Sequence, residues 1–343
     1  MSDILIIGTV AFDTIETPFG RVEKALGGSA TYASFAASFF SRPALISVIG
    51  RDFPEEYIKL LKNRGINLQG LKTDDKTFHW EGFYEYDMNE AKTKKTELNS
   101  LENFKVKVPE EYKDLKYVFL ANIDPEQQHE TLKQMRKPEF VVLDTMNFWI
   151  SHKKRQLMDV IKKADVLLLN DGEARQLFNT ASLVKAANEA LILGPKAIII
   201  KKGEHGALLF TKNKHIENAW HASEQSTRSQ DEHFRDARKS EECERVRNEA
   251  HSHLKDLRHF SAPGYPLENI KDPTGCGDSF GGAFIGYIAK TNDLSEQNFR
   301  RAIVYGSVVA SHNAEDFGLN RLKTLKMGDI EKRYKEFQAI REF

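Results

Sequence analysis

The sequence predicts an α/β protein whose doubly wound, mostly parallel sheet carries helices on both faces. Short apolar runs with the length of buried strands recur along the chain and alternate with segments of helical pattern. That alternation is typical of right-handed βαβ units. Glycine-rich or acidic residues follow several of the runs, at the edge where open α/β sheets bind ligands. We therefore expect a single α/β domain over residues 1–343 that contains a ligand site.

The composition fits a globular protein without a nucleic-acid or membrane partner. Hydrophobic residues make up 40% of the 343 residues, and the formal net charge is zero. That balance gives no electrostatic reason to expect nucleic acid or an acidic membrane as partner. The two cysteines, Cys243 and Cys276, lack zinc-ligand spacing and favour a reducing, cytoplasmic setting. No signal peptide or membrane-length apolar run is visible, which predicts a soluble protein.

The chain opens on a strand with a candidate ligand-binding residue behind it. Residues 4–7 form a continuous apolar run that ends at Gly8, as in a strand buried on both faces. Asp13 follows, where an aspartate can either bind a ligand or form a turn. Gly27 and Gly28 begin a helix of small residues, and their lack of a side chain lets a ligand approach the backbone. The next predicted elements are a strand at 44–49 and a helix at 55–64.

Residues 77–100 differ in character from the segments around them. The stretch from Thr77 to Tyr86 is aromatic and alternating, with no long helical stripe. Two or three antiparallel strands fit this pattern, and they are too few to form a domain alone. Two interpretations remain open at this point, a lid over a ligand or a plain surface hairpin.

From residue 116 the α/β alternation resumes. Polar residues follow the strands, and we consider Asn122, Asp124, Asp144 and Asn147 as candidates on this ground. Asn170 and Glu173 are a further pair, which also fits a capping box at a helix start. A strand, glycine turn and strand at 201–210 contains Lys201 and Gly203. The strands expected in this half lie at 117–120, 141–143, 166–169 and 197–200.

Residues 216–258 interrupt the alternation. They are polar, mix both charges, and contain four histidines and Cys243, with a partial helical stripe over 231–257. No pair of these residues has a recognisable zinc-ligand spacing. We predict a charged surface insertion, either helical or partly disordered, because loop-closure entropy rises slowly with loop length.

The rest of the chain is organised around the glycine-rich stretch 272–282, which leads directly into an apolar helix. Glycines let the backbone take conformations closed to other residues, so the unpaired amides of Gly275, Cys276 and Gly277 would converge at the helix N-terminus as an anion site. Asp278 beside them would repel a bare phosphate unless it takes a proton from an attacking nucleophile. The alternative is an ordinary helix start. A second helix is expected at 299–313.

These motifs resemble those of the ribokinase-like (pfkB) family of sugar and nucleoside kinases, whose signature is Asp-Thr/Pro-x-Gly-Ala-Gly-Asp before a small-residue helix. Cys276 stands where that family usually has Ala, Gly or Ser, and we expect the change to be tolerated because only the backbone N–H is needed. The pair Gly27-Gly28 resembles the N-terminal signature of the family, although Tyr32 replaces a frequent Asn. The resemblance covers nearly the whole chain except 216–258.

The resemblance implies an ATP- and magnesium-dependent kinase that phosphorylates a hydroxyl of a sugar or nucleoside. It implies that Asp278 is the general base, that the Gly275–Gly277 amides hold charge on the γ-phosphoryl group, and that Asp13 binds the acceptor together with Gly27 and Gly28. The 77–100 strands would be a small β lid, and a homodimer joined through this lid is a further implied arrangement. Residues implied to lie near nucleotide and magnesium are Asn170, Glu173 (to the metal through water), Lys201, Gly203, Asp272, Thr274 and Asn313, with Asp272 also shaping the loop and contributing to a monovalent-cation site such as one for K⁺.

Two other functions stay open beside a general sugar or nucleoside kinase. One is a nucleoside kinase of the inosine–guanosine type specifically, because the aromatic lid and residues 27–32 resemble those of such kinases as much as those of simple sugar kinases. The other is a non-catalytic sugar or nucleotide sensor on the same fold, which the intact Asp278 disfavours because a sensor needs no base. A dehydrogenase lacks its Gly-x-Gly-x-x-Gly after a strand, and a P-loop kinase lacks its Gly-x₄-Gly-Lys-Ser/Thr.

Overall fold

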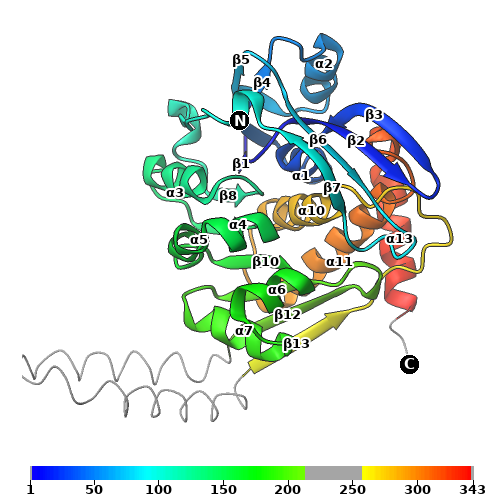
Figure 1. The fold of residues 1–343 in the computed structure, drawn as a ribbon. Coiled ribbons are helices and arrows are strands. Elements are labelled where there is room, and N and C mark those ends of the chain that lie inside the picture. Colours follow the sequence, from blue (N-terminus) through cyan, green and yellow to red (C-terminus); the bar gives the residue numbers. More distant parts are fainter. Residues whose placement is uncertain (1, 213–256, 341–343) are drawn as a thin grey trace, which may run out of the picture.

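The computed structural model describes residues 2–212 and 257–340, and its main feature is a nine-stranded sheet (Figure 1). The strand order is β13-β12-β11-β10-β9-β8-β1-β4-β5. Neighbours from β5 to β11 pair in parallel, and β12 and β13 add an antiparallel edge. The mostly parallel sheet is therefore confirmed. The strands are β1 (Ile4–Ile7), β4 (Pro43–Gly50), β5 (Asn67–Asp74), β8 (Tyr117–Leu120), β9 (Phe140–Leu143), β10 (Val166–Asn170), β11 (Ala197–Lys201), β12 (Ala207–Lys212) and β13 (Leu257–Ala262).

Helices cover both faces of this sheet, as a doubly wound fold requires. Strand side chains alternate between the faces, so that in β1 Ile4 and Ile6 join one hydrophobic core while Leu5 and Ile7 join the other. The first core packs against α1 (Ser29–Ala37), α2 (Glu55–Asn63), α10 (Cys276–Thr291), α11 (Glu296–Asn313), α12 (Asn320–Thr324) and α13 (Met327–Ala339). The second packs against α3 (Pro125–Gln134), α4 (Asn147–His152), α5 (Lys154–Ile161), α6 (Asp171–Phe178) and α7 (Leu183–Ile192).

A separate four-stranded sheet, hereafter the lid, has the order β3-β2-β6-β7. The strands β6 (Phe78–Phe83) and β7 (Lys92–Glu97) fall within the predicted 77–100 segment and pair antiparallel. The prediction was incomplete, because β2 (Ala11–Thr17) and β3 (Gly20–Gly27) complete the sheet. Asp13 therefore lies inside a lid strand and not in a turn after β1. The pairing of β2 with β6 joins residues more than sixty positions apart, which local sequence patterns do not reveal.

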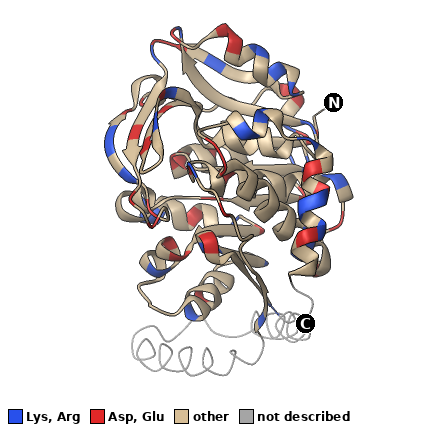
Figure 2. Cartoon of the chain, turned by 90° about the vertical axis from the view of Figure 1, so that its right-hand side faces the viewer, with Lys and Arg blue, Asp and Glu red and all other residues tan. Residues whose placement is uncertain are grey.

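The predicted insertion at 216–258 lies almost entirely outside the described residues. Its last two residues do not belong to it, because β13 begins at Leu257 and pairs with Lys212 of β12. Acidic and basic residues alternate along the outer helices, which agrees with a net charge of zero (Figure 2). Within residues 2–212 and 257–340, no helix is long and apolar enough to cross a membrane.

Candidate active site

The turn before α10 has a backbone conformation that only glycine adopts easily. Gly275 has φ = 74° and is the N-cap of the helix. A Cβ atom at this position would lie 2.4 Å from the ring of Tyr32, which is buried in α1. Tyr32, which stands where the family often has Asn, therefore packs its ring against Gly275. Its hydroxyl is buried and has no hydrogen-bond partner among the described residues.

Two of the three predicted anion-binding amides are free. In the described part of the chain, the N–H groups of Gly275 and Gly277 have no acceptor. The prediction was wrong for Cys276, whose N–H donates to the Pro273 carbonyl at 3.1 Å and closes the turn. Its thiol contacts the Ala310 carbonyl, and burial raises the pKa of this thiol to about 12, so that it stays protonated. The loop therefore presents two amides at the N-terminus of α10.

Asp278 lies in the first turn of α10, beside these amides. Burial raises the pKa of its carboxyl group to about 7, and the nearby Asp144 carboxylate adds to this effect, while Lys201 opposes it. A carboxyl group that titrates near neutral pH is suited to accept a proton during a reaction. The environment of Asp278 therefore agrees with a general base.

A buried cluster of opposite charges lies on the other side of the loop. The Lys201 Nζ atom donates to Asp144 Oδ2 at 2.7 Å, and a Cβ atom on Gly277 would lie 3.2 Å from the same nitrogen. Burial alone would lower the pKa of Lys201, but the Asp144 and Glu173 carboxylates outweigh it and the pKa is raised. Lys201 thus places a permanent positive charge against the glycine loop. Gly203 follows it in the turn to β12, with φ = 54°.

Glu173 closes the capping box that the sequence predicted. Its carboxylate accepts from the Asn170 N–H at 2.7 Å, and its own N–H donates to Asn170 Oδ1 at 2.7 Å. The side chain is buried, and burial raises its pKa despite the nearby Lys201. The described residues contain no cluster of three metal-ligating side chains. The single carboxylate of Glu173 suits Mg²⁺, which commonly keeps several waters and takes its other ligands from one or two carboxylates and the phosphates.

Asp13 reaches the same region from the lid. Its Oδ2 accepts from the Gly28 N–H at 3.3 Å, and a Cβ atom on Gly27 would lie only 1.9 Å from that oxygen. Burial, together with the charges of Asp272 and Asp278, raises the pKa of Asp13 to about 7, although the hydrogen bond from the Gly28 N–H opposes the rise. The predicted acceptor residue and the predicted base therefore lie close enough to influence each other's charge, although 265 positions separate them in the sequence.

Two buried side chains, those of Asp272 and Asn313, stabilise the conformation of the glycine loop. Asp272 is fully buried, and its two oxygens accept from the N–H groups of Thr274 (2.8 Å) and Gly318 (2.9 Å), so that the carboxylate ties the start of the loop to the segment after α11. Asn313 is also fully buried and donates to the Thr274 carbonyl at 2.8 Å. Its side-chain nitrogen thus contacts the loop backbone, and the nucleotide contact of Asn313 stays a prediction. Its side-chain oxygen has no partner among the described residues.

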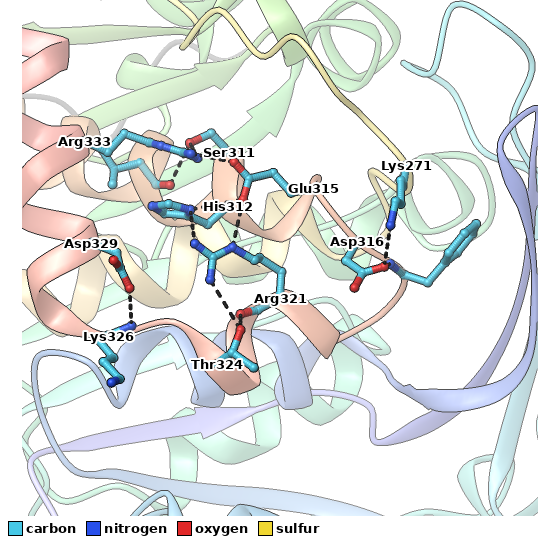
Figure 3. Close-up of polar contacts among 12 residues, drawn as sticks. Lys271, Ser311, His312, Glu315, Asp316, Arg321, Thr324, Lys326, Asp329 and Arg333 are labelled. Atoms are coloured by element: carbon cyan, nitrogen blue, oxygen red, sulfur yellow. Dashed lines mark hydrogen bonds and ion pairs between the residues drawn. The ribbon is translucent and has the colours of Figure 1, made fainter.

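The segment after α11 is fixed by a network of ions around Glu315 (Figure 3). The Glu315 carboxylate accepts from Arg333, from Arg321 Nε at 2.9 Å and from His312 Nδ1 at 3.4 Å. Burial acts to raise its pKa, but the three hydrogen bonds dominate and hold the pKa at about 2. Since Asn313 and Gly318 lie on either side of Glu315, this network positions the two groups that hold the glycine loop.

Lid and core also meet directly, at contacts that local sequence patterns did not identify. The Tyr84 hydroxyl, just after β6, accepts from Thr274 Oγ1 at 3.2 Å. A Cβ atom on Gly20 would lie 3.3 Å from the Phe317 ring, and one on Gly203 would lie 2.3 Å from Asn89 Oδ1. The alternating aromatics of 77–86 were the available signal for Tyr84, but its partner could not be inferred.

Two strand-end candidates from the sequence have structural roles. Asn122 accepts from the Trp149 indole at 2.9 Å, and Asp124 caps α3 and pairs with Lys153 at 2.7 Å. Asp144 is the strand-end candidate that joins the site, through Lys201.

Comparison with known proteins places this arrangement in a family. Residues 1–223 match the model of the pfkB family of carbohydrate kinases. The chain belongs to this pfkB family. Like its family, it is a kinase that transfers a phosphoryl group to a hydroxyl of its acceptor.

Three relatives extend the comparison of this pfkB-family kinase. A cytidine kinase of Thermococcus kodakarensis is 25% identical over 301 residues, which cover 86% of this chain and 92% of that protein. The Methanocaldococcus jannaschii nucleoside kinase matches with a TM-score of 0.69 and 19% identity, over 98% of this chain and 99% of that one. An E. coli ribokinase II solved with ATP and Mg²⁺ matches with a TM-score of 0.70 and 16% identity, over 98% and 100%. These structures share the fold of the kinase described here.

Proposed function

We propose that this pfkB-family kinase uses ATP to phosphorylate a hydroxyl of a nucleoside. The observation that carries the proposal is the position of Asp278 beside the free amides of Gly275 and Gly277, with Asp13 near enough for the charge of Asp278 to raise its pKa. Such a site offers a carboxylate for sugar hydroxyls, a carboxyl group that titrates near pH 7, and donors for a phosphoryl group. The nucleoside acceptor rests on the similarity to a cytidine kinase along 86% of the chain.

In the proposed reaction, the acceptor oxygen attacks the γ-phosphorus of ATP and the bond to the ADP oxygen breaks. Asp278 takes the proton of the attacking hydroxyl. The Gly275 and Gly277 amides, with the Lys201 ammonium beside them, stabilise the negative charge that develops on the transferred group. Removing one such donor typically lowers the rate by about 100- to 1000-fold. Mg²⁺, held through water by Glu173, would neutralise charge on the nucleotide phosphates.

Asp13 is proposed to bind the acceptor. A carboxylate with a single amide donor, from Gly28, has lone pairs left for two hydroxyl groups of a ribose. Gly27 is needed for Asp13 to hold this position, because a Cβ atom at Gly27 would collide with the carboxylate, and Gly28 supplies the amide that binds it. Thr274 and Gly203 are proposed to border the nucleotide, on the two sides of the phosphate position.

Three further properties are proposed. Asp272 is a fully buried carboxylate with no cationic partner in the described part of the chain, which supports dependence on a monovalent cation such as K⁺. Turnover would then fall when K⁺ is replaced by tetramethylammonium. A homodimer through the lid would be visible in light scattering. The use of ATP and a reduced Cys276 support a cytoplasmic location.

The test of the proposed function is an ADP-release assay over a panel of acceptors. Cytidine, uridine, inosine, guanosine, ribose and fructose would be compared at equal concentration with ATP and Mg²⁺. Nucleosides should show the higher kcat/KM. A preference for ribose or fructose would overturn the nucleoside acceptor, and binding without turnover for every compound would favour the sensor instead.

A further inference from the structure

One aromatic side chain of the lid lies beside Asp13 and has no role in the chemistry described above. In the parallel pairing of β2 with β6, the partner of Asp13 is Trp80. Paired residues on neighbouring strands project from the same face of a sheet, and the strands lie about 4.8 Å apart. Trp80 therefore projects on the face of the lid that carries the proposed acceptor-binding carboxylate.

Two contacts establish which way this face points. The Trp80 indole N–H donates to Thr93 Oγ1 at 3.1 Å, and Thr93 is the β7 partner of Gly82, two residues beyond Trp80. Tyr84, two residues further, bonds to Thr274 in the glycine loop at 3.2 Å. Trp80 and Tyr84 thus share the inner face of the lid, which is turned toward the loop.

The indole lies flat across the strand because of a glycine. A Cβ atom on Gly82 would lie 2.2 Å and 2.3 Å from the two outermost carbons of the Trp80 six-membered ring. Any other residue at 82 would therefore push the ring away. The hydrogen bond to Thr93 holds the same edge of the indole, so that the ring has little freedom left to lose on binding. The side chain is only partly buried, which leaves indole surface available for a ligand.

The opposite face of the lid has a different chemistry. It carries the hydrogen bond of Thr14 with His79 at 3.0 Å and the ion pair of His79 with Glu97 at 2.9 Å. Arg21 pairs there with Glu81 at 3.3 Å. A fixed aromatic plane is thus present on the face that bears Asp13, while charged groups occupy the other.

We propose that Trp80, held flat over Gly82, is the surface on which the base of the acceptor nucleoside stacks while Asp13 binds its sugar. This inference rests on the proposed nucleoside acceptor and adds the residue that selects for the base. A base attached to a sugar at Asp13 is within reach of the neighbouring strand, and stacking tolerates any base because each has a π-face. Trp80 would then favour nucleosides over free sugars without choosing strongly among bases.

The experiment compares Trp80→Leu and Trp80→Phe with the full-length wild-type protein. Calorimetry would give the dissociation constants of cytidine, inosine and ribose. Loss of stacking should weaken both nucleosides by roughly 5- to 150-fold in Trp80→Leu, and by less in Trp80→Phe, while ribose changes little. Phe83→Leu is the matched control, since it removes an aromatic ring from the same strand on the opposite face. Its nucleoside affinities should equal those of the wild type.

Tryptophan fluorescence gives a second readout that a merely structural role would not change. Cytidine should quench the emission of the wild type but not that of Trp80→Phe, in which Trp149 and Trp220 remain as internal references. Equal nucleoside affinity in Trp80→Leu and the wild type, or equal quenching in Trp80→Phe, would overturn the stacking role alone. If the wild type binds ribose but neither nucleoside, the proposed acceptor and the stacking role both fail.

Discussion

Replacement of Asp278 by Asn should stop the reaction and at the same time stabilise the folded protein. The stabilisation follows from the raised pKa. A carboxyl group whose pKa is about 7 in the folded state and 3.8 in the unfolded state is protonated only in the folded chain between these values. The folded state therefore loses stability as the pH rises from about 4 to about 7, and the loss persists above that range.

The size of the effect can be worked out from the same shift. At about 1.4 kcal/mol for each tenfold change in proton affinity, the rise from 3.8 to about 7 corresponds to on the order of 4 kcal/mol at pH 8. Asn cannot ionise and removes this cost, together with the repulsion that Asp278 exerts on Asp13. For a chain of this size, that corresponds to a gain in Tm of several degrees at pH 8 and almost none at pH 4.

Differential scanning calorimetry at pH 4, 6 and 8 would measure the gain, and ADP release would measure the loss of turnover. Turnover should fall by about 100-fold or more, which is the usual contribution of a general base. Glu315→Gln is the control of opposite sign: with a folded-state pKa of about 2, its carboxylate stabilises the protein above about pH 4.5, so the variant should melt lower at pH 8. A melting temperature of Asp278→Asn no higher than that of the wild type at pH 8 would contradict the raised pKa, and near-normal turnover would contradict the base role.

Three further variants or conditions test other parts of the site. In Asp13→Ala, acceptor affinity should fall by about one to two powers of ten for each lost charge-assisted hydrogen bond while ATP affinity stays the same, and an equal loss for both ligands in calorimetry would contradict the acceptor role. Because the base must be ionised, kcat/KM of the wild type should rise with pH through about 7, and a profile that is flat from pH 6 to 8 would argue against Asp278. Replacing residues 214–255 by a short Gly-Ser turn should leave cooperative melting intact, since Lys212 and Leu257 are already paired, and loss of the folded protein would show that the segment is integral.

The fold and the centre of the site could be predicted because their signals are contiguous in the sequence. Gly275, Gly277 and Asp278 lie within four consecutive positions, and each buried parallel strand forms a short apolar run of its own. The capping box of Asn170 and Glu173 is equally local, and it is present as expected.

The remaining features depend on contacts between distant residues. Asp13 lies in β2, which contains Asp, Thr and Glu and therefore lacks the apolar run of a buried strand. β2 becomes part of the lid only through its pairing with β3 and β6. The edge strand β5 is polar and was missed for a similar reason. Which amide of the loop closes its turn is decided by the backbone conformation at Pro273 and Gly275, so the sequence could not identify Cys276 as the occupied one.

The register of β12 with β13 marks a point at which the chain can be divided. Six residue pairs, from Ala207–Ala262 to Lys212–Leu257, bring the two strand ends opposite each other. Because these two strand ends already lie side by side, the covalent connection between them is not needed to bring β12 and β13 together. A cut here would separate residues 1–212, with Asp13 and Lys201, from residues 257–343, with the glycine loop and Asp278. Each fragment would carry half of the site, so the appearance of activity on mixing would report their reassembly and make this edge a place to build a split enzyme.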